Sequence, residues 1–150
     1  MADIVDSATR SRMMSGIRSR DTRPEMVIRR GLHARGYRYR LHSRRLPGKP
    51  DLVFKSRRAV IFVNGCFWHG HSCHLFKWPS TRASWWRAKI EGNRARDASV
   101  REQIADMGWR QLRVWECALK GVNRRSPDDV VEEVATWLEG DEADREIRGT

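Results

Sequence analysis

The sequence predicts an α/β domain in which two parallel strands bring reactive side chains to one edge of a sheet. An unbroken apolar run at residues 59–63, β-branched and aromatic, indicates a strand buried on both faces. A long helical stretch at 81–107 and a second strand at 109–116 follow it. A strand–helix–strand unit joins parallel strands by a right-handed crossover, so both carboxyl ends should lie at the same edge.

A helix is predicted upstream of this unit. Thr22 can cap its N-terminus, and Glu25 completes a capping box, with Pro24 in the first turn. Gly36 would end the helix. Capping is a sufficient structural role for Glu25 when this residue is considered alone.

The remaining elements are shorter or lie near the end of the chain. Residues 37–41 alternate large side chains with arginine, which indicates a half-exposed strand. A turn-rich loop at 46–50 leads to a strand at 52–54, and a hairpin turn at 55–57 returns the chain to the buried strand. The last helix is predicted at 126–140, between a Ser-Pro start and a glycine.

Composition restricts the partners. The chain has 150 residues and a formal net charge of +11, with 30 Lys and Arg against 19 Asp and Glu. This balance favours a polyanion, most often nucleic acid. No apolar run approaches the roughly 18 residues of a membrane span, so no membrane partner is expected.

The chain is expected to hold a single domain at residues 21–140. Residues 1–20 predict a mobile basic arm that orders on a partner, with a merely solvated tail as the alternative. Residues 141–150 predict a loose charged tail. Three cysteines and no signal peptide favour a reducing cytoplasm, where clustered Cys and His indicate a metal site before a disulfide.

Cysteine and histidine gather directly after the buried strand. Cys66, His71 and Cys73 lie in this loop, and Cys117 follows the second strand of the parallel pair. Because the two strands end at one edge, these side chains should converge on a tetrahedral zinc site. Four protein ligands leave no place for a catalytic water, which indicates a structural ion. His74 is an alternative ligand, and a loop with unrelated thiols is the alternative to a metal site.

A carboxylate precedes the strand at 52–54, and another lies on the long helix. Asp51 follows Pro50 and faces the polar end of the buried strand, which suits a Mg²⁺ ligand, although a turn aspartate is the commoner case. Trp85, Lys89, Asn93 and Asp97 recur every four residues and therefore share one side of the helix.

Four motifs of this sequence occur together: Pro50-Asp51, Gly65-Cys66-Phe67-Trp68-His69, Trp86-x2-Lys89-x3-Asn93-x2-Arg96-Asp97 and Val114-Trp115-Glu116-Cys117. This combination resembles the very short patch repair (Vsr) mismatch endonucleases over about residues 1–140. The resemblance implies a restriction-endonuclease-like fold, with a central mixed β-sheet flanked by helices and a structural zinc site.

The resemblance also implies an activity. A monomer would nick one DNA strand 5′ of the thymine in a T:G mismatch that arises from deaminated 5-methylcytosine, using Mg²⁺. A MutL-type mismatch repair protein is implied as a further partner.

Residue roles follow from the same resemblance. Asp51 and the backbone carbonyl of Val63 would bind Mg²⁺, and His69 would act as general base on the attacking water. Glu25 and Asp97 would hold metal-bound water or orient the histidine. This chain has Asn64 where some members of the family have a histidine, and an amide cannot carry a proton in that way.

The aromatic and polar residues of the motifs would contact DNA. Phe67, Trp68 and Trp86 would wedge into the base stack beside the mismatch, and packing in the core is the alternative. The resemblance adds Lys89, Asn93 and Arg96 as DNA-binding residues. Two other functions remain open: a zinc-stabilised DNA-binding module without catalysis, and a related nickase with a different mismatch or site specificity.

Overall fold

The computed structural model describes residues 20–150, and the predicted arm lies outside this range except for Arg20. A mixed five-stranded sheet in the order β1-β2-β3-β4-β5 confirms the predicted α/β class. The strands are β1 (Arg40–Leu41), β2 (Leu52–Phe54), β3 (Ala59–Asn64), β4 (Arg110–Trp115) and β5 (Asp144–Ile147). Strand β2 is antiparallel to both of its neighbours, β1 and β3, whereas β3, β4 and β5 are parallel.

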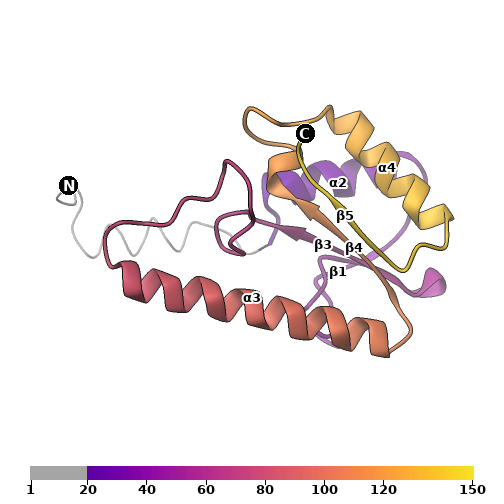
Figure 1. Cartoon of the computed structure of the whole chain (residues 1–150). Coiled ribbons are helices and arrows are strands. Elements are labelled where there is room, and N and C mark those ends of the chain that lie inside the picture. Colours follow the sequence, from indigo (N-terminus) through magenta and orange to yellow (C-terminus); the bar gives the residue numbers. More distant parts are fainter. Residues whose placement is uncertain (1–19) are drawn as a thin grey trace.

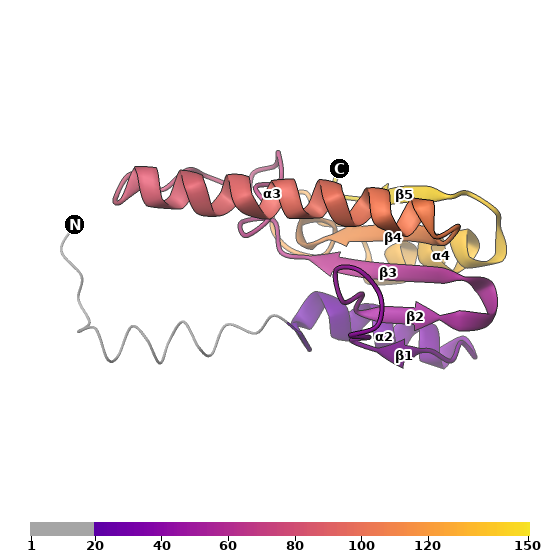
Figure 2. The ribbon, with the colours of Figure 1, turned by 90° about the horizontal axis from the view of Figure 1, so that it is seen from below.

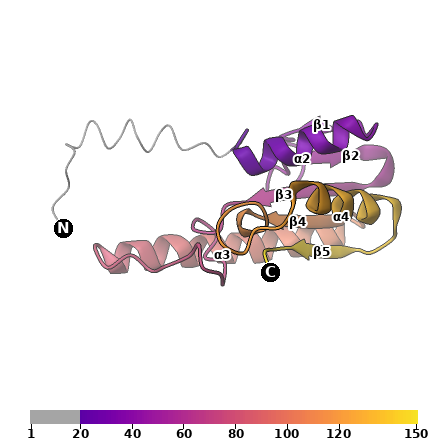
Figure 3. The ribbon, with the colours of Figure 1, turned by 90° about the horizontal axis from the view of Figure 1, so that it is seen from above.

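Three helices in the described part of the chain make layers on the two faces of the sheet. Helices α2 (Arg23–Ala34) and α4 (Pro127–Glu139) lie on one face, and α3 (Ala83–Asp106) lies on the other (Figure 1). Views from below and above show that the first turns of α3 project beyond the sheet, on the side of the loop that follows β3 (Figures 2 and 3). None of these helices is both long and apolar enough to cross a membrane.

Burial on both faces explains the apolar run of β3. Ala59 and Ile61 pack in the large core under α2 and α4, whereas Val60 and Phe62 pack with Ile104 of α3. Alternate residues of a strand point to opposite faces, so a strand between two helical layers needs apolar side chains at every position.

The predicted N-cap of the first helix is confirmed. Thr22 Oγ1 accepts a hydrogen bond from the backbone N–H of Glu25 at 3.4 Å, and the Glu25 carboxylate accepts one from the N–H of Asp21 at 2.9 Å. The Glu25 side chain is 1% exposed and reaches inward from the start of α2. Capping and a place in a polar cluster therefore coexist at this residue.

The prediction of a loose tail at 141–150 was wrong. Residues 144–147 form β5, which pairs with β4 in parallel, and Ile147 is 1% exposed. Further along, the N–H of Gly149 donates to Cys117 Sγ at 3.4 Å. The charged composition of this segment suggested solvent, but the open edge of β4 supplies backbone partners and the core beneath it accepts an isoleucine.

Two predicted boundaries also shift. The half-exposed strand at 37–41 is reduced to the two residues of β1, and the long helix begins at Ala83 rather than at 81. Gly48 lies at φ +74°, and a Cβ there would come within 2.6 Å of Val100 in α3. The loop before β2 therefore passes too close to α3 for a larger residue.

Candidate active site and metal centre

The four predicted zinc ligands come together at the carboxyl ends of β3 and β4. One ligand atom from each of Cys66, His71, Cys73 and Cys117 lies within 4.8 Å of the others. His71 Nδ1 is 3.5 Å from Cys66 Sγ and 3.7 Å from Cys117 Sγ. Ligands of a tetrahedral zinc lie about 3.6 Å apart when the bonds are about 2.3 Å to sulfur and 2.1 Å to nitrogen, so this donor set fits the ion.

The surroundings of these four residues favour a bound cation. Burial lowers the pKa of His71 to about 4, which keeps its imidazole neutral with a free lone pair. Burial also raises the pKa of the Cys66 and Cys117 thiols, so their thiolates need a positive charge nearby. The His71 ring stacks on Trp115 at 4.0 Å. His74, the alternative ligand, is exposed and contacts Asn123 instead.

A cleft of about 1010 Å³ opens beside this centre, between the ends of the central strands and α3. Asp51, Val63, Asn64, His69 and Asp97 all line it. The sequence therefore identified residues that the fold brings to one cavity. Glu25 does not line the cleft but contacts His42, which does.

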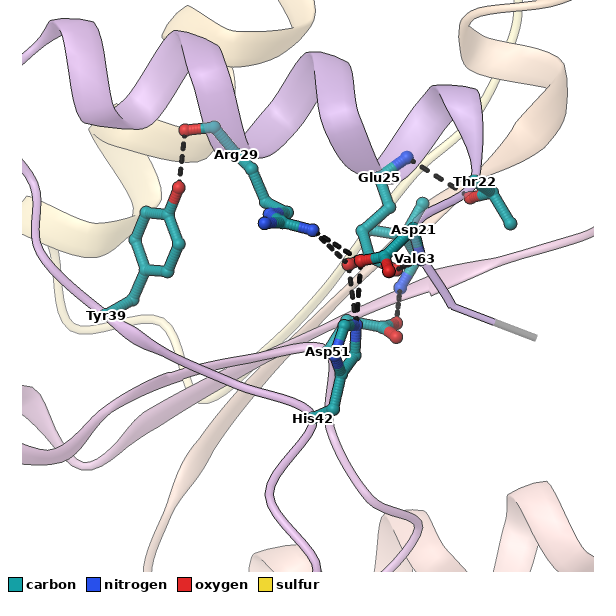
Figure 4. Close-up of polar contacts among 8 residues, drawn as sticks. All are labelled: Asp21, Thr22, Glu25, Arg29, Tyr39, His42, Asp51 and Val63. Carbon is teal, nitrogen blue, oxygen red and sulfur yellow. Dashed lines mark hydrogen bonds and ion pairs between the residues drawn. The ribbon is translucent and has the colours of Figure 1, made fainter. Parts of the chain in front are cut away.

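Asp51 lies beside a polar cluster at the start of α2 (Figure 4). Its Oδ2 accepts a hydrogen bond from the backbone N–H of Val63 at 2.7 Å. Glu25 Oε2 lies 2.7 Å from His42 Nε2, and Arg29 contacts both Asp21, at 2.6 Å, and Glu25, at 3.4 Å. The cluster thus joins the start of α2 to the loop before β2.

The electrostatics of Asp51 suit a divalent cation. Burial raises the pKa of its carboxyl to about 7, and the nearby Glu25 and Asp21 raise it as well, against the hydrogen bond from Val63. In a strand the N–H and C=O of one residue point to the same side, so the Val63 carbonyl also faces the Asp51 side of β3. Mg²⁺ commonly binds one or two protein oxygens and completes its octahedron with water and phosphate, so these two donors and the surplus of negative charge suit it.

His69 is oriented by a carboxylate from α3. Its Nδ1 lies 2.5 Å from Asp97 Oδ2, and its ring meets Trp115 edge-on at 6.0 Å. The Asp97 carboxylate can only accept, so Nδ1–H donates the hydrogen bond and Nε2 carries the lone pair of the neutral ring. This arrangement leaves one nitrogen able to take a proton.

The three predicted wedge residues form one aromatic cluster. Phe67 contacts Trp68 at 5.4 Å and Trp86 at 5.2 Å, both edge to face, and Trp68 is 5.7 Å from Trp86. All three are half-buried, whereas Trp85 is 48% exposed. The cluster is carried by the loop after β3 and the first turns of α3.

The predicted DNA-contacting residues of α3 differ in their surroundings. Asn93 Nδ2 donates to the backbone carbonyl of Trp68 at 2.7 Å, so this amide holds the aromatic loop. Arg96 donates to the Asn93 side chain, and Lys89 is exposed. The structure places Asn93 in an internal contact and leaves Lys89 accessible.

Comparison with known proteins agrees with this geometry. A family model described as DNA mismatch endonuclease Vsr matches residues 2–75. The DNA mismatch endonuclease Vsr of Escherichia coli is 42% identical over 147 residues, which are 98% of this chain and 94% of the relative. The chain belongs to the Vsr DNA mismatch endonuclease family. It is therefore an enzyme of a nuclease family.

Other Vsr relatives carry the name of nicking enzymes. The type II nicking enzyme V.XorIIP of Xanthomonas oryzae pv. oryzae is 50% identical over 119 residues, 79% of this chain and 88% of the relative. V.NmeAIP of Neisseria meningitidis, another type II nicking enzyme, is 39% identical over 120 residues, 80% of this chain and 86% of the relative.

Sequence patterns missed several residues of the site. His42 and Arg29 reach Glu25 across the cluster, and Arg113 of β4 lines the cleft. Trp115 contacts both His69 and His71. The sequence did contain a signal for Arg113. This arginine lies in the middle of a strand predicted beside the buried one, and burial of an unpaired charge costs free energy.

Proposed function

We propose that this protein is a Mg²⁺-dependent, strand-specific DNA endonuclease that nicks 5′ of the thymine in T:G mismatches formed from deaminated 5-methylcytosine. The observation that carries the proposal is one cleft lined by Asp51 and by the His69–Asp97 pair. Membership of the Vsr family supports mismatched DNA as the substrate, and the relatives named as nicking enzymes support cleavage of a single strand.

His69 would take the proton of the attacking water. Because Nδ1 is hydrogen-bonded to Asp97, Nε2 would act as the general base. Asp97 would then stabilise the imidazolium that forms. Asp51 and the Val63 carbonyl would hold Mg²⁺, which supplies charge neutralisation at the scissile phosphate. Glu25, fixed by Arg29 and His42, would orient water beside Asp51. Asn64, 8% exposed at the cleft wall, would hydrogen-bond water or phosphate without carrying a proton.

The aromatic cluster would open the duplex at the lesion. Phe67, Trp68 and Trp86 would enter the base stack, which costs a few kcal/mol per step and least at a mispair. Exposed cations such as Lys89 and Arg96 would meet the phosphate backbone. The Cys66, His71, Cys73 and Cys117 centre would hold zinc and thereby fix the loop that carries His69 and the wedge.

A nicking assay on a panel of mismatched duplexes tests the proposal. We expect cutting of the thymine strand of a T:G duplex in Mg²⁺ and none in EDTA. Asp51→Ala and His69→Ala should abolish cutting and keep binding, whereas His33→Ala, an exposed residue near the end of α2, should leave both intact. Cutting of another mispair or of matched DNA would instead assign a different specificity, and binding without any cutting would refute the nuclease mechanism.

A MutL-type partner and a monomeric, cytoplasmic enzyme complete the proposal. Pull-down of a MutL-type protein tests the partner and sedimentation of the purified chain tests the monomeric state, both separately from the chemistry.

A further inference from the structure

Strand β4 carries two polar side chains in a place where the fold buries the strand. Gln111 is 1% exposed and Arg113 is 4% exposed, and they alternate with the buried Leu112 and Val114. The two apolar residues pack in the core under α2 and α4, so Gln111 and Arg113 face α3. A buried arginine costs several kcal/mol unless it is paired.

Neutral groups fix the orientation of the Arg113 guanidinium. Gln111 Nε2 donates to the backbone carbonyl of Arg101 in α3 at 2.9 Å, which leaves its Oε1 to accept from Arg113 Nη1, also at 2.9 Å. The Phe62 ring lies 4.7 Å from the guanidinium carbon. These contacts hold the charge in place and do not neutralise it.

Carboxylates that could have paired with Arg113 are engaged elsewhere. Arg101 binds Asp144 at 2.9 Å and Glu146 at 3.6 Å, and Asp97 binds His69. Among residues 20–150, Arg113 forms no ion pair, and Gln111 is its one hydrogen-bond partner. Burial lowers the pKa of the Arg113 guanidinium and the charge of Arg101 lowers it further, while the more distant charges of Asp144, Asp97 and Glu146 oppose this.

Arg113 is nevertheless accessible from the cleft. It lines the large cleft with Asp51 and His69, and it also lines an adjoining cavity of about 210 Å³ with Asn64 and Asp97. Guanidinium has five N–H donors, of which Gln111 uses one. A fixed fork of donors without a direct ion-pair partner among residues 20–150 matches the geometry of a phosphate.

We propose that Arg113 binds a backbone phosphate of the cut strand inside the cleft, with Gln111 as its positioning residue. This inference rests on the proposed nuclease function for its substrate. Phosphate is favoured over a base edge because Arg113 lies in the same cavity as the residues proposed to act on the phosphodiester. The charge would then be balanced only in the complex with DNA.

Replacement by methionine separates this role from a structural one. Arg113→Met should lower the nicking rate about 10²- to 10³-fold, as expected for the loss of a preorganised charge, and leave the melting temperature unchanged or raised. The nicking rate of Arg113→Lys should lie between the rates of the wild type and of Arg113→Met. Arg110→Met is the matched control, since Arg110 lies on the same strand over the Trp137 ring at 4.4 Å and lines neither cavity. A lower melting temperature with nicking unchanged would refute the proposal.

The contacted phosphate can be found by chemical substitution of the DNA. Neutral methylphosphonate linkages are introduced one at a time beside the cut, and each phosphorothioate diastereomer is introduced at the cut. At one linkage, the substitution should lower the nicking rate of the wild-type enzyme but cause no further loss of rate in Arg113→Met. If the loss of rate from the DNA substitution and the loss from Arg113→Met multiply at every linkage, the proposal is overturned. A base contact would then explain any loss of activity in the variant.

A metal-independent measurement distinguishes failure of this inference from failure of the proposed function. Inorganic phosphate without Mg²⁺ should raise the melting temperature of wild type and of Asp51→Asn, and raise that of Arg113→Met less. If phosphate raises the melting temperature of all three proteins equally and wild-type nicking depends on Mg²⁺, only the role proposed for Arg113 is refuted. Nicking that persists in Asp51→Asn would instead remove the proposed chemistry and leave the anion site.

Discussion

Two clusters of metal-binding residue types lie at the carboxyl end of β3, and they are built in opposite ways. The Cys66, His71, Cys73 and Cys117 centre is enclosed, and backbone N–H groups of Cys117 and Gly149 point at its sulfurs. The cluster around Asp51 consists of oxygen donors beside an open cleft. The first brings four protein donor atoms together, whereas the second offers few and leaves room for water and substrate.

In the proposed function, one sheet edge serves both stability and chemistry. The enclosed centre holds the loop after β3, and that loop presents His69 to the cleft. The open cluster contains Asp51, and burial raises the pKa of its carboxyl to about 7. Such a shift disfavours the charged carboxylate and is common at functional sites. Variants of the enclosed centre should therefore lose the fold, and variants of the open cluster should lose activity while keeping the fold.

The largest effect should come from the enclosed centre. Cys117→Ser should abolish zinc binding and lower the melting temperature by more than roughly 10 °C, because binding energy of a structural zinc is folding energy. Metal content by mass spectrometry and thermal unfolding measure this. His74→Ala, next to the centre but outside the ligand set, is the control. A folded, active Cys117→Ser protein would contradict the structural role.

Asp51→Asn should invert that pattern. We expect nicking to fall by about 10³-fold or more, because the ligand of the activating cation is lost, and stability to stay the same or increase. Single-turnover nicking and thermal unfolding give the two values. Asp128→Asn, an exposed residue in the first turn of α4 that lines neither cavity, is the matched control. Retained nicking would show that Asp51 does not hold the metal.

Asp97→Asn should have a smaller effect on the same chemistry. An amide can present N–H to His69 Nδ1 and favour the wrong tautomer, so the rate should fall about 10²-fold with little change in stability. Asp106→Asn, at the exposed end of α3, should nick at the wild-type rate. If Asp97→Asn and wild type share one pH–rate profile and one rate, Asp97 does not orient the base.

The smallest effect, at most about 1.4 kcal/mol for each pH unit, should appear in the pH dependence of stability without added Mg²⁺. The Asp51 carboxyl has a pKa of 3.8 unfolded and about 7 folded, so the folded state binds more protons between these values. Its contribution to stability is present below about pH 4 and is lost as the pH rises through 7, a change of about 2–4 kcal/mol.

Comparison of wild type with Asp51→Asn isolates this slope. His71 has a pKa lowered to about 4 and therefore adds an opposite slope in both proteins, which cancels in the difference. Denaturant unfolding at several pH values provides the measurement. A wild-type-minus-variant difference that does not vary with pH would mean that the Asp51 carboxyl is not held in a charge-disfavouring site.

Local chemistry was enough to predict much of this protein. The run at 59–63 predicted a strand buried on both faces, and Thr22 could be recognised as a helix cap from the residues beside it. Topology then predicted the meeting of Cys66 with Cys117, because parallel strands joined by a crossover end at one edge. The aromatic and Cys/His motifs carried the family resemblance.

Other features depended on contacts that no local pattern contains. Residues 144–147 became a strand because β4 offered an open edge, and their charged composition gave no sign of it. His42 joined Glu25 across a loop, and Arg113 came to face the cleft only when α3 covered its strand. Sequence determined which residues are apolar, capping or reactive, since these are properties of a residue and its neighbours. Tertiary structure decided which charges are paired and which remain available to a substrate, because pairing depends on distances between distant segments of the chain.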